Sequence, residues 1–442
     1  MASIRKRGDT YTICVCTGRD INGKKLNEYT TFVPDKKKTD KQNQKALDEF
    51  VYEFEQRVKN GLVAGDKMTL KAFSEKWLEE YAEKELEETT LAAYKMRLKY
   101  NILPNLGHYK LNEIKPLIIK QFLNDMKKDG ARVDGKSGGY SNGTVNKMRI
   151  ILSSIFSSAV EWEYMQSNPC YGNIRSKKCK KVEAKEVQCF SIEQTRIFLE
   201  CLDKNFHVVI PEHTRKCSDG QVHTIKKCIS NKIVSIPLQF KVFFNFAIFG
   251  GFRRGELIAL TWEDLDFEKN TVSINKSTYY VSGHTENKVP KTSTSIRTVV
   301  LPQSVMLLAK QLQDEQLKYI LKMGTAWEGE RQKNRLCKNY LFTQVNGKQM
   351  AIHTPRKKFH EIIKLYNNLQ DDKNMHLPFI PLHGLRHTSA TLMISQNVDI
   401  STVSARLGHA QTSTTLDIYA HALEKLDVTA SEALAQVLTR NA

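Results

Sequence analysis

The sequence has no apolar run long enough to cross a bilayer, for which about 20 consecutive apolar residues are needed. Its first seven residues, Met-Ala-Ser-Ile-Arg-Lys-Arg, lack the apolar core of a secretory signal. The stretch 382–421, which is rich in histidines, has neither a glycine-rich nucleotide loop nor a carboxylate cluster suited to a metal. We therefore expect a soluble, cytoplasmic protein that needs no membrane, no cofactor and no metal.

Disulfide and zinc patterns are also missing. Nine cysteines are scattered over 442 residues, an odd number that favours free thiols in a reducing compartment. Cys14 and Cys16 have no second pair at zinc-finger spacing. Four possible zinc ligands do lie close together within segment 206–235: His213, Cys217, His223 and Cys228. Their spacing matches no standard zinc pattern, and basic residues surround them, so we favour a polar surface insertion over a zinc site.

Acidic residues are scarce relative to basic ones, with 48 Asp and Glu against 67 Lys and Arg. The resulting net charge of +19 predicts a polyanionic partner, nucleic acid before an anionic membrane surface. A basic but inert surface is the alternative. The hydrophobic content of 40% is ordinary for a globular protein, and the length predicts two or three domains.

Residues 1–64 predict a small sheet backed by one helix. Residues 11–16 and 27–33 alternate in polarity, and Asn22-Gly23 between them is typical of a hairpin turn. The helix that follows has apolar residues four apart: Ala46, Phe50, Phe54 and Val58. Basic residues surround the predicted sheet, namely Arg5, Lys6, Arg7, Lys24 and Lys25. They favour a small DNA-binding module, with a solvated charged face as the alternative.

Residues 65–170 predict a compact bundle of four helices. The second of these is expected to stop near Pro104, and the third to run from Pro116 to about Lys128, with Gly130 as its C-cap. A basic linker, 171–188, follows the bundle. Its lysines either remain solvated or lie along a phosphate backbone: Lys177, Lys178, Lys180 and Lys181.

Residues 189–442 predict a mostly helical domain with a small sheet, so that the whole chain is mainly α with small β-sheets, an α+β fold. Ser191 to Gln194 forms a capping-box pattern, and a buried helix at 240–249 is expected to break at Gly250-Gly251. Short strands are expected at 271–275, 277–281 and 295–301. Helices are expected at 303–321 and 355–365, with a final amphipathic helix near 428–438.

Six groups in this last domain have chemistry in common: Arg253, Lys291, His383, Arg386, His409 and Tyr419. Arg253 and Arg386 occur in apolar helical segments, where an unpaired guanidinium is costly, so each needs an anion. Two guanidinium forks are able to hold one phosphate and to neutralise the charge that develops during phosphoryl transfer. A tyrosine is able to attack that phosphorus and form a covalent intermediate.

These groups occur within five motifs, in this order: Gly251-Phe-Arg253-Arg-Gly-Glu256-Leu, Pro290-Lys291-Thr-Ser-Thr-Ser-Ile-Arg297, His383-Gly-Leu-Arg386-His387-Thr, Leu407-Gly-His409 and Asp417-Ile-Tyr419. On these motifs the chain resembles a tyrosine recombinase of the lambda-integrase type. The bundle, with Leu103-Pro-Asn-Leu-Gly107, resembles the core-binding domain of that family. We see no departure from the family pattern at a catalytic position.

The resemblance implies a role for each group. Arg253 and Arg386 would clamp the scissile phosphate, and Lys291 would protonate the leaving 5′-oxygen. His383 would accept a proton or bond the phosphate, and His409 would orient the phosphate. Tyr419 would attack to form a 3′-phosphotyrosyl link, without metal or ATP. Glu256 and His387 are expected to buttress the site.

The resemblance also implies partners. A small N-terminal module ahead of the bundle is similar to the arm-binding domain of phage and conjugative-element integrases. Double-stranded DNA with core and arm-type attachment sites would be the substrate, and a homotetramer the active assembly, with the C-terminal helix packed on a neighbouring subunit. An excisionase and a host DNA-bending protein would be further partners. Two alternatives remain, a DNA-binding accessory protein derived from a recombinase and a type IB topoisomerase-like enzyme.

Overall fold

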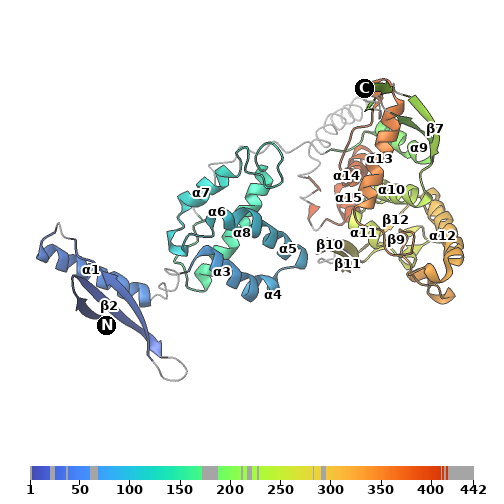
Figure 1. The fold of residues 1–442 in the computed structure, drawn as a ribbon. Helices are drawn as coiled ribbons and strands as arrows, with labels where there is room; N and C mark the ends of the chain where they lie inside the picture. The colour runs from blue at the N-terminus through green and yellow to red at the C-terminus, as the bar shows by residue number, and fades with distance from the viewer. Residues whose placement is uncertain are drawn as a thin grey trace, which may run out of the picture. The chain divides into compact units, whose positions relative to one another are not determined.

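The computed structural model describes residues 2–19, 25–35, 38–59, 68–171, 188–210, 213–216, 222–225, 228–281, 283–289, 295–409, 411–412 and 415–416. The chain divides into two compact units, Met1–Lys181 and Val182–Ala442 (Figure 1). Among the described helices, none is both long and apolar enough to cross a membrane.

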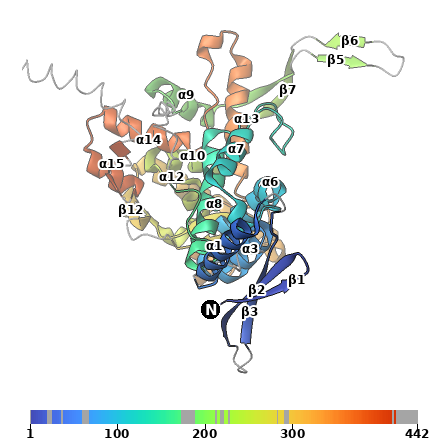
Figure 2. The same ribbon diagram turned by 90° about the vertical axis from the view of Figure 1, so that its left-hand side faces the viewer.

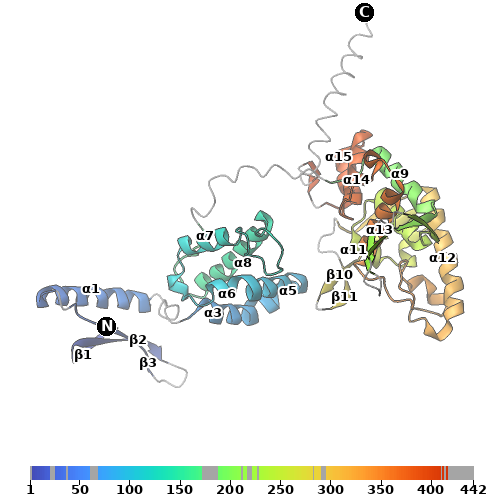
Figure 3. The same cartoon turned by 45° about the horizontal axis from the view of Figure 1, so that its top comes forward.

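The N-terminal part is a three-stranded antiparallel sheet packed on one helix. Strands β1 (Ser3–Arg7), β2 (Thr10–Arg19) and β3 (Lys25–Phe32) pair in that order, and α1 (Asp40–Lys59) covers one face of the sheet (Figure 3). Ile13 and Val15 alternate toward α1 and are buried with Leu47, Phe54 and Val58. The two predicted strands and the helix are confirmed, whereas β1 was not predicted, because each of its residues is exposed and it has no apolar alternation to detect.

The second part of this unit is the predicted helical bundle. The first helix, α3 (Leu70–Trp77), begins at a Thr69 cap and continues through a π-helical turn into α4 (Glu83–Glu85). Helix α5 (Glu88–Arg97) likewise continues through a π-helical turn into α6 (Leu103–Leu106). The helical run ends at Leu106, close to the predicted stop near Pro104, and Pro104 itself fits the first turn of α6. Helices α7 (Pro116–Asp125) and α8 (Asn142–Glu161) complete the bundle. Helix α7 ends earlier than the predicted Lys128.

The apolar residues that recur along the helices of this bundle form its core. Phe73 and Trp77 of α3 are fully buried among apolar residues of α5, α7 and α8, and the indole Nε1 of Trp77 donates to the Ser158 hydroxyl at 3.0 Å. A buried polar atom that has a partner carries little cost. These aromatic residues are therefore structural.

The second unit is built on buried helices. They are α9 (Ile192–Asp203), α10 (Leu238–Gly250), α11 (Arg254–Ala259), α12 (Gln303–Met323), α13 (Thr354–Leu369), α14 (Gly384–Ser395) and α15 (Ile400–Leu407). The Ser191 hydroxyl accepts from the Gln194 amide, and Gln194 bonds back to the Ser191 amide, so the predicted capping box is confirmed. Helix α10 is mostly apolar, with Gln239, Lys241 and Asn245 as its polar residues, and it lies in a core of packed phenylalanines, including Phe198, Phe244 and Phe359.

Short strands surround that helical core. A sheet in the order β12 (Arg297–Val300), β9 (Thr271–Ile274) and β8 (Leu265–Asp266) is accompanied by a hairpin of β10 (Ser277–Val281) and β11 (His284–Lys288). The strands predicted at 271–275, 277–281 and 295–301 are confirmed. Strand β11 brings the chain to Lys288, shortly before Lys291, which lies outside the described residues.

The described residues of the insertion 206–235 form strands, which the sequence did not predict. Strands β4 (Phe206–Ile210) and β7 (Cys228–Val234) form one two-stranded sheet, and β5 (His213–Lys216) and β6 (Val222–Ile225) form another (Figure 2). His223 is opposite Arg215, and Cys228 is opposite Ile210. Cys217 lies outside the described residues.

Candidate active site and DNA-binding face

Arg253 is the N-cap residue of α11 and is fixed there by Glu256. Helix α10 ends at Gly250, its C-cap Gly251 has a left-handed φ of 63°, and the chain turns directly into α11. A Cβ at Gly251 would lie 2.7 Å from Leu407 Cδ2, so glycine permits both the turn and the close approach of α15. The Glu256 carboxylate accepts from the Arg253 amide and from its Nη1, each at 2.8 Å. The Arg253 side chain is thereby oriented while remaining 37% exposed.

Arg386 reaches the same turn from α14. Its residue is only 2% exposed, and its Nη1 donates to the Gly251 carbonyl at 2.8 Å. His383 is the N-cap residue of α14, and its ring lies 4.9 Å from that of His387, one helical turn further on. The hydrogen bond to Gly251 thus places Arg386 beside the turn that carries Arg253.

His409 is brought to Arg253 by the left-handed end of α15. Gly408 has a φ of 69°, a conformation that glycine adopts without strain, and its carbonyl accepts from Arg253 Nη2 at 3.0 Å. His409 Nδ1 hydrogen-bonds the buried Thr415 hydroxyl at 2.8 Å, which leaves Nε2 as the other hydrogen-bonding nitrogen of the ring. One contact thus joins residues 155 positions apart in the chain.

Burial first, and the neighbouring positive charges second, favour the neutral form of the two candidate histidines. Burial, and then the charges of Arg386 and Arg253, lower the pKa of His409 to about 4. Burial, followed by His387 and the same arginines, lowers the pKa of His383 to about 4, although part of this residue is exposed to solvent. The site therefore combines the fixed positive charges of Arg253 and Arg386 with two neutral imidazoles. This arrangement attracts an anion.

We expect both imidazoles to titrate near pH 4 in the DNA-free protein, against about 6.5 for an unperturbed histidine. Their contribution to stability is complete above pH 6.5 and is lost as the pH falls toward 4, because the unfolded chain binds those protons first. NMR titration of the ring nitrogens measures this, with assignments from His409→Gln and His383→Gln. Inorganic phosphate should raise both pKa values; ordinary titration near pH 6.5 without any anion would contradict the described geometry.

The structure brings four of the six candidate groups into one region: Arg253, His383, Arg386 and His409. Lys291 and Tyr419 lie outside the described residues, as do Lys24 and the linker lysines Lys177, Lys178, Lys180 and Lys181. One residue had received no role from the sequence, although it ends the second motif: Arg297 is buried between Glu256 and the Gly408 turn. Its place in the same motif as Lys291 was the feature of the sequence from which a role for Arg297 could have been predicted.

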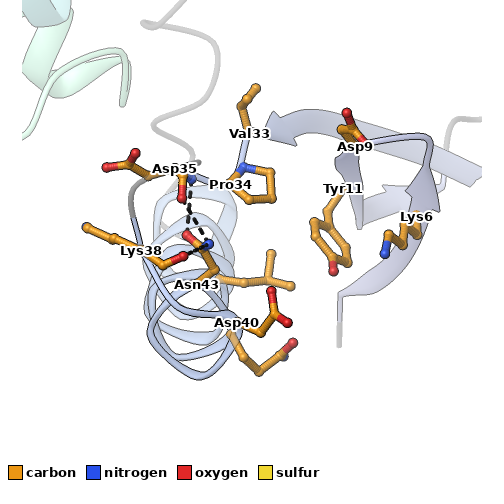
Figure 4. Close-up of a pocket in the computed structure, with 11 residues that line it drawn as sticks. Lys6, Asp9, Tyr11, Val33, Pro34, Asp35, Lys38, Asp40 and Asn43 are labelled. Carbon is orange, nitrogen blue, oxygen red and sulfur yellow. Dashed lines mark hydrogen bonds between the residues drawn. The ribbon is translucent and has the colours of Figure 1, made fainter.

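The N-terminal sheet separates the basic residues of β1 by face. Arg5 lies opposite Thr12, which in turn lies opposite Thr31, on the face away from α1. Lys6 lies opposite Tyr11, on the face toward α1, and its Nζ lies 5.7 Å from the centre of the Tyr11 ring. A cavity of about 520 Å³ is lined by Lys6 and Tyr11 from the sheet and by Asp40 and Asn43 from α1 (Figure 4). Arg5 and Arg7 share the open face, because side chains alternate along a strand.

Comparison with known proteins identifies the class. The family model described as "Phage integrase family" matches residues 218–425, and that of the "Phage integrase, N-terminal SAM-like domain" matches residues 69–127. A protein named "Tyrosine recombinase XerC-like" from Caldanaerobacter subterraneus is 26% identical over 98% of this chain and 97% of its own length. The ICEBs1 integrase of Bacillus subtilis is 27% identical over 74% of this chain and 73% of its own.

Solved structures agree on the fold. A Tn1549 transposon integrase in complex with transposon right end DNA gives a TM-score of 0.60 at 18% identity, covering 83% of this chain and 100% of that one. A lambda integrase dimer bound to a core site gives 0.51 at 16% identity and covers 94% of each chain. This chain belongs to the phage integrase family. It is a tyrosine recombinase of the type found in phages and conjugative transposons.

Proposed function

We propose that this recombinase integrates and excises a phage or conjugative element by cutting and rejoining duplex DNA at attachment sites. Tyr419 attacks the scissile phosphorus, forming a 3′-phosphotyrosyl bond as the bond to the 5′-oxygen breaks. The tyrosyl proton passes to His383, and Lys291 protonates the leaving 5′-oxygen. The observation that carries the proposal is the contact of Arg253 with the Gly408 carbonyl, beside His409.

The chemistry of the described side chains supports this assignment. Arg253 and Arg386 present planar guanidinium forks, which match two phosphate oxygens and neutralise charge in the transition state. His409, neutral and hydrogen-bonded through Nδ1, offers its other nitrogen to the same phosphate. We propose that these groups replace a metal ion as the source of positive charge. Because the phosphotyrosyl bond retains the energy of the phosphodiester, religation is proposed to need no ATP.

We propose a domain assignment that follows from this chemistry. Residues 1–64 bind arm-type DNA, residues 65–170 bind the core site and residues 189–442 carry the reaction. The basic linker, residues 171–188, joins the core-binding residues to the catalytic ones. The active assembly is a homotetramer on two duplexes, in the cytoplasm of a bacterial host and on its nucleoid. An excisionase and a host DNA-bending protein set the direction of the reaction.

A suicide substrate tests the cleavage reaction. The duplex covers the element's own end and carries a nick beside the scissile phosphate, so that the released fragment diffuses away and the covalent product accumulates. We expect a protein–DNA adduct that survives denaturation. Binding without an adduct would favour the accessory-protein alternative. Relaxation of supercoils without recombination of two paired sites would favour the topoisomerase-like alternative.

The open face of the N-terminal sheet gives a prediction for arm binding. Arg5→Ala in the full chain should weaken binding to an arm-site duplex by about tenfold, because it removes a guanidinium on the face away from α1. The log–log salt slope should become less steep by about one, as for one phosphate contact. Fluorescence anisotropy measures both.

Lys6→Ala is the matched control, since Lys6 belongs to the same strand and carries the same charge but faces Tyr11. Its affinity should stay within about twofold of that of the unchanged protein. Equal losses in the two variants would show that the sheet contributes only a diffuse positive charge. Arm binding through the open face would then be wrong.

A further inference from the structure

Arg297 begins β12 and is almost fully buried, with 7% of its side chain exposed. Its Nη2 donates to Glu256 Oε2 at 2.8 Å and its Nη1 to Glu256 Oε1 at 3.2 Å. Its Nε donates to the Arg406 carbonyl at 2.8 Å, and its Nη1 also reaches the Ser295 carbonyl. The planar fork is therefore held in one orientation by partners on both sides.

Glu256 is shared between this arginine and Arg253. Its side chain is 3% exposed and accepts from Arg297 through both oxygens and from Arg253 through both oxygens as well. Burial alone would raise the pKa of this carboxyl, but the hydrogen bonds and charges of Arg297 and Arg253 outweigh burial and leave the pKa below its ordinary value. The carboxylate thus remains charged and divided between two cations.

Arg297 also touches the turn that presents His409. A Cβ on Gly408 would lie 2.8 Å from Arg297 Nη1, so the guanidinium occupies the space beside that glycine. The carbonyl of Arg406, two residues earlier, accepts from Arg297, and the carbonyl of Gly408 accepts from Arg253. The two arginines therefore hold the end of α15 from adjacent positions.

We propose that Arg297 is a positioning residue. It holds the Arg253 guanidinium and the Gly408–His409 turn in the orientation in which both contact the scissile phosphate. This inference rests on the proposed function. Without Arg297, the buried Glu256 carboxylate would be neutralised by Arg253 alone, and the guanidinium would be drawn away from the DNA phosphate. The site would also lose one of its fixed positive charges, and the Gly408 turn would lose the group that packs against it.

The cleavage assay separates positioning from DNA affinity. Arg297→Met should lower the cleavage rate at saturating suicide substrate by at least about tenfold, while the Kd for that duplex stays within about twofold. Arg297→Lys should recover only part of the rate, because an ammonium is unable to bond Glu256 and the Arg406 carbonyl with the same fork. Adding Glu256→Gln to Arg297→Met should recover more, because the anion that captures Arg253 is then removed.

Lys276→Met is the matched control for a purely structural effect. Lys276 pairs with the buried Asp264 at 3.0 Å in the same unit, so its loss also breaks a buried ion pair. This variant should lose thermal stability while keeping its cleavage rate per folded molecule. If Arg297→Met and Lys276→Met behave alike, or if Arg297→Met cleaves at the rate of the unchanged protein, the positioning role is overturned.

A second readout does not depend on catalysis. The charge of Arg297 contributes, after burial, Arg386, Arg253 and His387, to the lowered pKa of His409. Arg297→Met should therefore change the ring-nitrogen resonances and raise the pKa of His409, whereas Lys276→Met should leave both unchanged. An unchanged His409 spectrum would overturn the inference. Absence of adduct in the unchanged protein would contradict the proposed function instead.

Discussion

Tyr419→Phe is expected to abolish the covalent protein–DNA product while leaving DNA affinity unchanged. The substitution removes one oxygen atom, the proposed nucleophile, and keeps the aromatic ring. Loss of a nucleophile costs the whole covalent route, so the cleavage rate should fall by at least about 10³-fold. Denaturing gel electrophoresis of the suicide-substrate reaction measures the adduct, and anisotropy measures the affinity.

Tyr280→Phe provides the control for that experiment. Tyr280 lies on β10, is 49% exposed, and its ring forms a T-shaped pair with the ring of His353. It should cleave at the rate of the unchanged protein, because it supplies no group to the proposed site. Adduct formation that persists in Tyr419→Phe would show that another residue attacks the phosphorus.

Arg253→Ala is expected to lower the cleavage rate by about 10²- to 10³-fold, the usual cost of losing one donor to a developing negative charge. The fold should survive, since Glu256 keeps its two bonds to Arg297 and still caps α11. Arg253→Lys should recover little, because an ammonium is unable to bond two phosphate oxygens with a planar fork. Single-turnover kinetics on the suicide substrate give the rates.

The neighbouring arginine provides a matched control. Arg254 is also partly buried in the first turn of α11, and burial, with the nearby charge of Arg356, lowers its pKa. Arg254→Ala removes the same charge one residue away from the proposed clamp. Its cleavage rate should stay within about threefold of that of the unchanged protein. A larger effect in Arg254→Ala than in Arg253→Ala would mean that the motif had been assigned to the wrong arginine.

Much of the fold was predictable because its determinants are local. The Ser191 cap, the glycine that ends α10 and the apolar stripes of α3 and α8 each act within a few residues. The features that were missed depend on distant partners. Strand β1 exists because β2 pairs with it, and the strands of the 206–235 insertion likewise form by pairing with one another rather than by apolar alternation. The early end of α7 shows that helix boundaries are weakly encoded.

The sequence by itself predicted the chemical groups that we propose for this recombinase, because two arginines, a lysine, two histidines and a tyrosine occur in motifs of characteristic spacing. Tertiary structure alone decided how the described groups are held. Glu256 is divided between Arg253 and Arg297, and Arg253 bonds the Gly408 carbonyl, across 41 and 155 residues of chain. Spacing along a chain defines helix and strand faces, whereas such long-range contacts form only when separate elements pack and each buried charge must find its partner.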